Sequence, residues 1–242
     1  MDAVDVPALR RRWESVRERL AESLRRAGRA PQDVALIAVS KLHSAGEVAA
    51  VAAMGQVDFG ENYVQEACGK QEELALHPAC RAMRWHFIGH LQSRKAAQVA
   101  GRFALVHTVD SRRLAEALEK RAAALGTVQP VLIQVNIGAE PQKSGVMEDG
   151  LPALAEAVCA LPHLDLQGLM CLPPVFDNGP LARPHFARLR ELRDALRPLT
   201  GLPLLHLSMG MSGDFEEAVL EGATLIRVGT DIFGPRPPKT LA

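Results

Sequence analysis

The feature that most constrains the fold of this chain is a regular alternation between short apolar runs and longer stretches whose apolar residues recur at helical spacing. The runs are rich in β-branched residues and hold few polar breaks, which is typical of strands buried on both faces. The predicted strands cover residues 34–39, 57–60, 85–89, 104–109, 130–137, 164–170 and 204–210, with the last in 224–234. The predicted helices lie near 6–27, 45–54, 62–76, 93–100, 111–125, 148–160, 180–197 and 213–221. The sequence therefore predicts strands and helices in turn along the chain.

Strand–helix units of this number in 242 residues predict an α/β fold, a single (β/α)8 TIM barrel that spans residues 1–242. We expect an N-terminal helix within residues 1–30 and a frayed, proline-rich tail over residues 235–242. A doubly wound open sheet is the alternative. It is disfavoured because no GxGxxG motif follows the first strand and no change of composition marks a second half.

The composition indicates a folded protein without a strongly charged partner. Hydrophobic residues make up 48% of the chain and the formal net charge is zero, so we expect neither nucleic acid nor a membrane as a partner. The N-terminus lacks the apolar segment of a signal peptide, and no apolar run is long enough to span a bilayer. The four cysteines form no CxxC pair and have no metal-site spacing. We therefore expect a cytoplasmic protein with reduced thiols and no metal.

Polar residues gather directly after the predicted strands, where the active sites of such barrels lie. Lys41 stands at the end of the first strand, and Ser44 with Glu47 predicts a capping box for the helix that follows. Taken alone, a lysine at this place is an ordinary solvated loop residue. Its apolar surroundings would favour the neutral amine, which is the nucleophilic form.

Small residues follow the last two predicted strands. Residues 208–212 read Ser-Met-Gly-Met-Ser, and residues 227–230 read Arg-Val-Gly-Thr. Each glycine, taken singly, could serve only to turn the chain. Phosphate sites in such barrels, however, often come from the loops after strands seven and eight. A lysine on the same rim as a phosphate site predicts a phosphorylated aldehyde, and pyridoxal 5′-phosphate (PLP), which forms a Schiff base with lysine, fits both features.

An ordered set of motifs between Leu36 and Gly234 carries a resemblance to a known family. The motifs are AVSK, FGENYVQE, WHFIGHLQ, VNI with KSG, GLM, LSMGMSGDFEEAV and IRVGT with IFG. Together they resemble the pyridoxal phosphate homeostasis protein family, whose PLP-binding barrel is similar to the N-terminal domain of alanine racemase. The resemblance implies a fold-type III barrel that serves intracellular PLP (vitamin B6) homeostasis, by buffering the cofactor or delivering it to apo PLP-dependent enzymes.

The resemblance also implies the contacts with the cofactor. Lys41 would carry the Schiff base, Asn62 would lie beside the cofactor, and Arg227 would face the pyridine nitrogen. The phosphate would be bound by the small residues after the last two strands. No catalytic residue is implied, and we expect a monomer.

The phosphate-binding residues that the resemblance implies are Ser208, Gly229 and Thr230. Two nearby positions depart from the family pattern: Arg94 stands where asparagine is common, and Asp231 stands where a small residue is frequent. Neither is an implied contact, but Asp231 follows Thr230 and could alter the charge near the phosphate.

The same residues favour a binding protein over an enzyme. A guanidinium only donates hydrogen bonds, so Arg227 would keep the pyridine nitrogen unprotonated and the ring a poor electron sink. Racemisation would need a second acid/base on the opposite face of the ring. The chain has one tyrosine, Tyr63, which we expect to be packed or to bond locally. We therefore expect no robust catalytic activity, with a PLP-dependent amino-acid racemase as the alternative.

The histidines and one further lysine have less specific patterns. His86 and His90 are four residues apart, but they straddle the end of a strand, so helical metal-ligand geometry does not follow. His86 could face the pocket, and His206 is expected to be a hydrogen-bonded core residue. Lys143 of the KSG motif is expected to be a solvated loop lysine.

Overall fold

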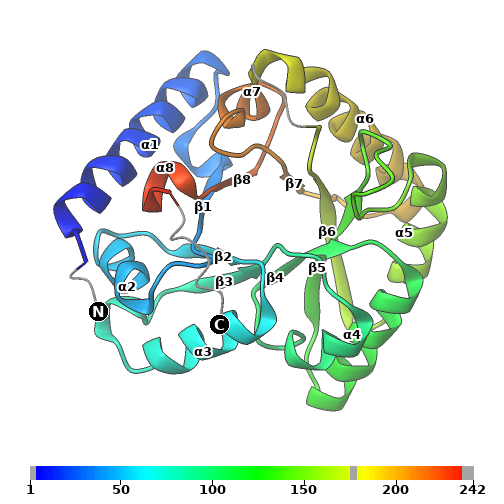
Figure 1. The fold of residues 1–242 in the computed structure, drawn as a ribbon. Coiled ribbons are helices and arrows are strands. Elements are labelled where there is room, and N and C mark those ends of the chain that lie inside the picture. The colour runs from blue at the N-terminus through cyan, green and yellow to red at the C-terminus, as the bar shows by residue number, and fades with distance from the viewer. Residues whose placement is uncertain (1–3, 175–178, 236–242) are drawn as a thin grey trace.

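The fold is a closed barrel of eight parallel strands in chain order (Figure 1). The structure, a computed structural model, describes residues 4–174 and 179–235. The strands are β1 Ala35–Val39, β2 Asp58–Glu61, β3 Arg84–Phe87, β4 Leu105–Val109, β5 Gln129–Val135, β6 Leu164–Cys171, β7 His206–Ser208 and β8 Leu225–Val228. Pairing of β1 with β8, with Ile37 opposite Arg227, closes the ring. The predicted (β/α)8 barrel is confirmed, and the open sheet is excluded.

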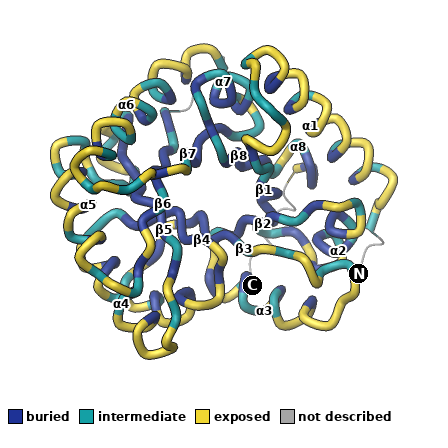
Figure 2. Tube along the Cα trace, turned by 180° about the vertical axis from the view of Figure 1, so that it is seen from behind, coloured by how far each residue is buried: buried dark blue, intermediate teal, exposed yellow. Residues whose placement is uncertain are grey.

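Helices form an outer layer around the barrel, and Figure 2 shows their exposed faces turned outward. The α-helices are α1 Val6–Arg26, α2 Ala45–Ala53, α3 Val64–Leu74, α4 Arg112–Leu125, α5 Leu151–Cys159, α6 Arg183–Thr200, α7 Phe215–Leu220 and α8 Thr230–Phe233. Short 3-10 helices are η1 Pro31–Asp33, η2 Pro78–Cys80, η3 Ser93–Gln98, η4 Glu148–Gly150 and η5 Gly179–Ala182. The predicted N-terminal helix is confirmed as α1, which packs against α7 and α8.

Two predicted elements differ from the structure. The segment near 93–100 forms the 3-10 helix η3 because Gln92 supplies no side-chain cap and the segment is too short for a stable α-helix. The strand predicted over 204–210 is limited to β7, since Leu204 has a positive φ of 41° and cannot continue an extended strand. The predicted tail, except its first residue, and residues 175–178 of the predicted loop after β6 lie outside the described residues.

The core lies in two places. The larger cluster fills the layer between the sheet and the helices, and its largest fully buried side chains include Phe59, Phe87 and Phe215. A smaller cluster, which includes Ile37 and Leu132, occupies alternate strand positions that face the barrel interior. Among residues 4–174 and 179–235, no helix is long and apolar enough to cross a membrane.

Candidate functional site

A cavity of about 400 Å³ opens at the C-terminal ends of the strands. Its lining includes Lys41, Asn62, Arg227, Gly229 and Thr230, which come from the ends of β1, β2 and β8 and the start of α8. A larger cavity of about 770 Å³ lies at the other end of the barrel, beneath α1. Barrels of this kind carry their chemistry at the C-terminal ends of the strands, so the smaller cavity is the candidate site.

The loop that carries Lys41 is held from below. Ser40 is fully buried, and its hydroxyl donates to Oε1 of Glu61 at 2.7 Å. Leu42, which follows Lys41, has a positive φ of 66°, and its N–H donates to Oε1 of Glu66 at 2.5 Å. The predicted capping box then starts α2: Ser44 and Glu47 exchange backbone and side-chain hydrogen bonds. The backbone on both sides of Lys41 is therefore fixed.

Lys70 of α3 is buried beneath this loop, and sequence reasoning missed it. Its Nζ donates to Ser40 O at 2.6 Å, Glu61 Oε1 at 2.7 Å and Glu66 Oε1 at 2.6 Å. Burial raises the pKa of Glu61, and the charge of Lys70 opposes that shift. The i,i+4 spacing of Glu66 and Lys70 was the available signal, but that spacing is common on exposed helices.

Asn62 lines the cavity and carries an unused hydrogen-bonding atom. Its Oδ1 is buried and has no partner among the described residues. A Cβ on Gly89 would lie 2.1 Å from the carbonyl oxygen of Asn62, so only glycine allows the two backbones this close. Buried polar atoms are nearly always hydrogen-bonded, so the unpartnered oxygen of this cavity-lining residue is a candidate contact for a bound group.

Arg227 brings a buried positive charge to the cavity. Its Nη1 donates to Ser208 Oγ at 2.6 Å and its Nη2 to Cys171 O at 2.9 Å. Burial lowers the pKa of Arg227, but a guanidinium keeps its charge. Burial also raises the pKa of the Cys171 thiol to about 12, so that thiol is neutral. In the described part of the chain no carboxylate forms an ion pair with Arg227, so its charge is available to a ligand.

Part of the cavity wall is built from small residues. Gly229 packs so closely on β1 that a Cβ there would lie 3.1 Å from Val39 O. Thr230 follows it, and Ser212 after β7 adds a second hydroxyl. An aldehyde-bearing, anionic cofactor fits this set: it would meet a lysine, a buried cation, an unpartnered amide oxygen and a wall of small hydroxyl residues.

Comparison with known proteins decides the family. Residues 4–237 match the family described as alanine racemase, N-terminal domain. The pyridoxal phosphate homeostasis protein of Pseudomonas aeruginosa is 48% identical over 222 residues, which cover 91% of this chain and 93% of that protein. The chain belongs to the pyridoxal phosphate homeostasis protein family.

Solved structures agree with this membership. PipY of Synechococcus elongatus, solved with PLP bound, is 41% identical, covers 90% of this chain and 99% of its own, and has a TM-score of 0.79. Alanine racemase from Corynebacterium glutamicum is 19% identical with a TM-score of 0.70, which shows a shared fold. The match covers 98% of this chain but only 63% of the racemase.

In this member of the pyridoxal phosphate homeostasis protein family, Ser208 does not line the cavity. It is fully buried in β7, where its hydroxyl lies 2.6 Å from Arg227 Nη1 and 2.8 Å from His107 Nδ1. The second serine of the same segment, Ser212, lines the cavity instead. A direct contact between Ser208 and a phosphate therefore stays a prediction.

The expectation that Lys143 is a solvated loop lysine is wrong. Lys143 lines the cavity, and its Nζ lies 2.6 Å from Glu140 Oε1 and donates to Pro173 O at 2.8 Å. The long loop after β5 folds back over the rim, because the Asn136 amide holds Glu140 and Lys143 carbonyls at 2.9 and 3.3 Å. Sequence reasoning could not show this return of the loop.

The remaining predicted residues lie away from the cavity. Asp231 pairs with Arg19 of α1 at 2.6 Å, and Arg94 is exposed and bonds to Gln92. Tyr63 is 50% exposed, so the first of its two expected roles, a packed residue, is wrong, and a local hydrogen bond stays a prediction. His206 has Nδ1 3.3 Å from Thr224 Oγ1, so it is hydrogen-bonded as expected, but it is half-buried and not a core residue.

His86 does not line the cavity either. Its ring is buried, with Nε2 2.9 Å from Asp58 Oδ1 and Nδ1 3.0 Å from His107 Nε2. Nowhere in residues 4–174 and 179–235 do three or more His, Cys, Asp or Glu side chains group as metal ligands.

Proposed function

We propose that this protein binds PLP in the cavity at the C-terminal ends of the strands and serves intracellular PLP homeostasis, by buffering the cofactor or delivering it to apo PLP-dependent enzymes. The observation that carries the proposal is the convergence of Lys41, Arg227 and Asn62, whose side-chain oxygen is unpartnered, on one cavity. A volume of about 400 Å³ suits a ligand of this size. The PLP-bound structure of PipY supports the assignment.

Each lining residue has a proposed role. Lys41 supplies the amine that holds the aldehyde as a Schiff base, and Asn62 lies beside the cofactor. Arg227 donates to the pyridine nitrogen and, because it only donates, keeps that nitrogen unprotonated. PLP supplies the reactive aldehyde and the electron-accepting ring.

The phosphate group is assigned to the small residues after β7 and β8. Ser208, Gly229 and Thr230 are the proposed residues, and Ser212 on the same wall offers a further hydroxyl. The cytoplasm is the proposed compartment and a monomer the proposed state. All four cysteines are free thiols, which supports a reducing compartment.

A PLP-dependent amino-acid racemase is the second candidate, and one observation weighs against it. Stereoinversion needs an acid/base on each face of the ring. The one tyrosine of the chain is half-exposed and lines a neighbouring hollow, not the cavity that holds Lys41. The cavity therefore lacks a tyrosine that could act as the second base.

Transfer of cofactor tests the proposed function. PLP-loaded protein is mixed with an apo PLP-dependent enzyme in the presence of a phosphatase that destroys free PLP. We expect the enzyme to regain activity faster than free PLP at the same concentration allows. Lys41→Ala, which cannot form the Schiff base, is the matched control and should lose this protection.

Two results would contradict the proposal. One is recovery of the apo-enzyme no better than with free PLP. The other is Lys41-dependent formation of D-isomers from L-amino acids at about 1 per second or more, the low end of ordinary enzyme turnover. The second result would make the racemase assignment correct.

A further inference from the structure

A chain of hydrogen bonds runs through the barrel interior from Arg227 to the opposite end. Arg227 Nη1 lies 2.6 Å from Ser208 Oγ, which lies 2.8 Å from His107 Nδ1. His107 Nε2 is 3.0 Å from His86 Nδ1, and His86 Nε2 is 2.9 Å from Asp58 Oδ1. These residues come from β8, β7, β4, β3 and β2, and all five are buried. The chain therefore crosses the molecule through five strands.

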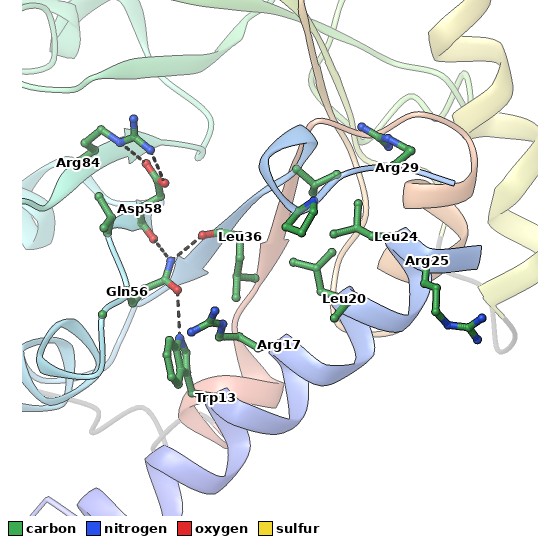
Figure 3. Close-up of a pocket in the computed structure, with 15 residues that line it drawn as sticks. Trp13, Arg17, Leu20, Leu24, Arg25, Arg29, Leu36, Gln56, Asp58 and Arg84 are labelled. Carbon is green, nitrogen blue, oxygen red and sulfur yellow. Dashed lines mark hydrogen bonds and ion pairs between the residues drawn. The ribbon is translucent and has the colours of Figure 1, made fainter. Parts of the chain in front are cut away.

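The far end of the chain reaches the larger cavity beneath α1, which Figure 3 shows. There Asp58 accepts two hydrogen bonds from Arg84, from Nε at 2.8 Å and from Nη2 at 2.7 Å. A guanidinium fork of this kind holds a carboxylate in one orientation. Asp58, the last acceptor of the hydrogen-bond series, is thus fixed by Arg84, which is not itself a member of that series.

With both histidines neutral, the carboxylate end dictates the direction of every hydrogen bond. Asp58 as a carboxylate only accepts, so His86 carries its proton on Nε2 and accepts at Nδ1. His107 therefore carries its proton on Nε2, and its Nδ1 accepts from the Ser208 O–H. Arg227 can only donate, so Ser208 accepts from it. One histidine tautomer satisfies every member, and the other sets two acceptors or two donors against each other.

The ionisation of the inner members agrees with this order. Burial lowers the pKa of His107 well below 6.5, and the charges of His86, Arg227 and His206 act in the same direction. Burial opposes ionisation of Asp58, but hydrogen bonds from His86 and Arg84 outweigh it, so the pKa of Asp58 is lowered. Near neutral pH, His107 is therefore neutral and Asp58 is a carboxylate.

We propose that Asp58, His86, His107 and Ser208 are positioning residues that lock Arg227 as a donor toward the cofactor cavity. Ser208 Oγ and Cys171 O fix the plane of the guanidinium by accepting from its two terminal nitrogens. The histidine tautomers prevent Ser208 from turning its own O–H toward Arg227. The consequence for the pyridine nitrogen rests on the proposed function, whereas the order of the chain does not.

Nitrogen NMR of protein labelled at histidine, without added cofactor, tests the chain directly. We expect His86 and His107 both to be neutral with the proton on Nε2, and Asp58→Asn to shift His86 toward the Nδ1-protonated form, because an amide can donate. Arg84→Gln is the matched control: it removes the outer pair but keeps the carboxylate, so both tautomers should persist. A proton on Nδ1 of either histidine in the unaltered protein, or no change in Asp58→Asn, would overturn the proposal.

Ser208→Ala provides a second, smaller change that cuts the link between Arg227 and His107. We expect the dissociation constant for pyridoxal, which lacks the phosphate that Ser208 is also proposed to bind, to rise by about tenfold, since one hydrogen bond to a charged group is lost, with unchanged tautomers at His86. A dissociation constant within about twofold of the unaltered protein would contradict the positioning role. Absence of PLP binding in the unaltered protein would instead contradict the proposed function. The tautomer measurement alone would then test the order of the hydrogen bonds.

Discussion

Two buried cations near the cavity are stabilised in different ways. Lys70 has two carboxylates within 2.7 Å, so its charge is compensated inside the protein. Arg227 has a hydroxyl and a backbone carbonyl as its hydrogen-bond acceptors, so its charge is not neutralised locally. A buried charge without a partner is costly, and a ligand that accepts a hydrogen bond would lower that cost. The residue that the protein leaves unpaired is therefore the one that faces the cavity.

Replacement of Arg227 by Glu should reverse the protonation of the bound pyridine ring. A carboxylate beside the nitrogen can only accept a hydrogen bond. Because only the protonated nitrogen can donate one, the pyridinium form is favoured. Nitrogen NMR of labelled PLP should move from the unprotonated to the protonated position in Arg227→Glu and stay unprotonated in Arg227→Gln, whose amide can still donate. A ring nitrogen that is already protonated in the unaltered protein would refute this role of Arg227.

The buried histidines predict a loss of stability in mild acid. Burial lowers the pKa of His107 and of His206 below 6.5, whereas both titrate near that value when unfolded. The unfolded chain therefore binds more protons below about pH 6.5, and the free energy of unfolding should fall by up to about 1.4 kcal/mol per pH unit for each group.

Urea unfolding between about pH 7.5 and about pH 5.5 measures this slope. His107→Gln should make the profile flatter, and His77→Gln, at an exposed position, should leave it unchanged. Equal slopes in the unaltered protein and His107→Gln would show that His107 is not buried in its neutral form.

At the scale of the elements, α3 and the loop after β1 are joined by the Lys70 network. Lys70→Met should leave the buried Glu61 and the half-buried Glu66 without their cation and lower the free energy of unfolding by about 3–5 kcal/mol. The same substitution at Lys120, on the exposed face of α4, should change it by no more than about 0.5 kcal/mol. Urea denaturation compares the two variants, and similar midpoints for both would show that the buried network contributes little.

The elements could be predicted from the sequence where the signal is local. The capping box of Ser44 and Glu47 sets the start of α2 as expected, because both hydrogen bonds involve residues three apart. The short β7 could not be foreseen, since the backbone turn at Leu204 depends on its packing. Lys70 and Lys143 were missed or misplaced for the same reason: besides a neighbour in sequence, each has a partner on a distant segment, Ser40 O and Pro173 O.

At the scale of the whole molecule, the barrel and much of its site could be predicted because the strand topology alone determines which residues lie together. Parallel strands with helical connections bring every strand end to one rim, so residues that follow strands converge. Lys41, Asn62 and Thr230 meet at one cavity on that account. The series of hydrogen bonds that links Asp58 to Arg227 through His86, His107 and Ser208 was not predicted. Its members stand inside strands, where an inward polar residue carries no sequence signal of its partner.

Lys41 is the proposed covalent attachment point of PLP, and reductive trapping measures directly which lysine carries the cofactor. Protein incubated with PLP is reduced with borohydride, digested, and its modified peptide identified by mass spectrometry. Lys143 lines the same cavity and is the natural competitor, so Lys41→Ala and Lys143→Ala are treated in parallel. We expect the label on Lys41 in the unaltered protein and in Lys143→Ala. A label carried by Lys143 or any other lysine in the unaltered protein, or no label at all, would contradict the account.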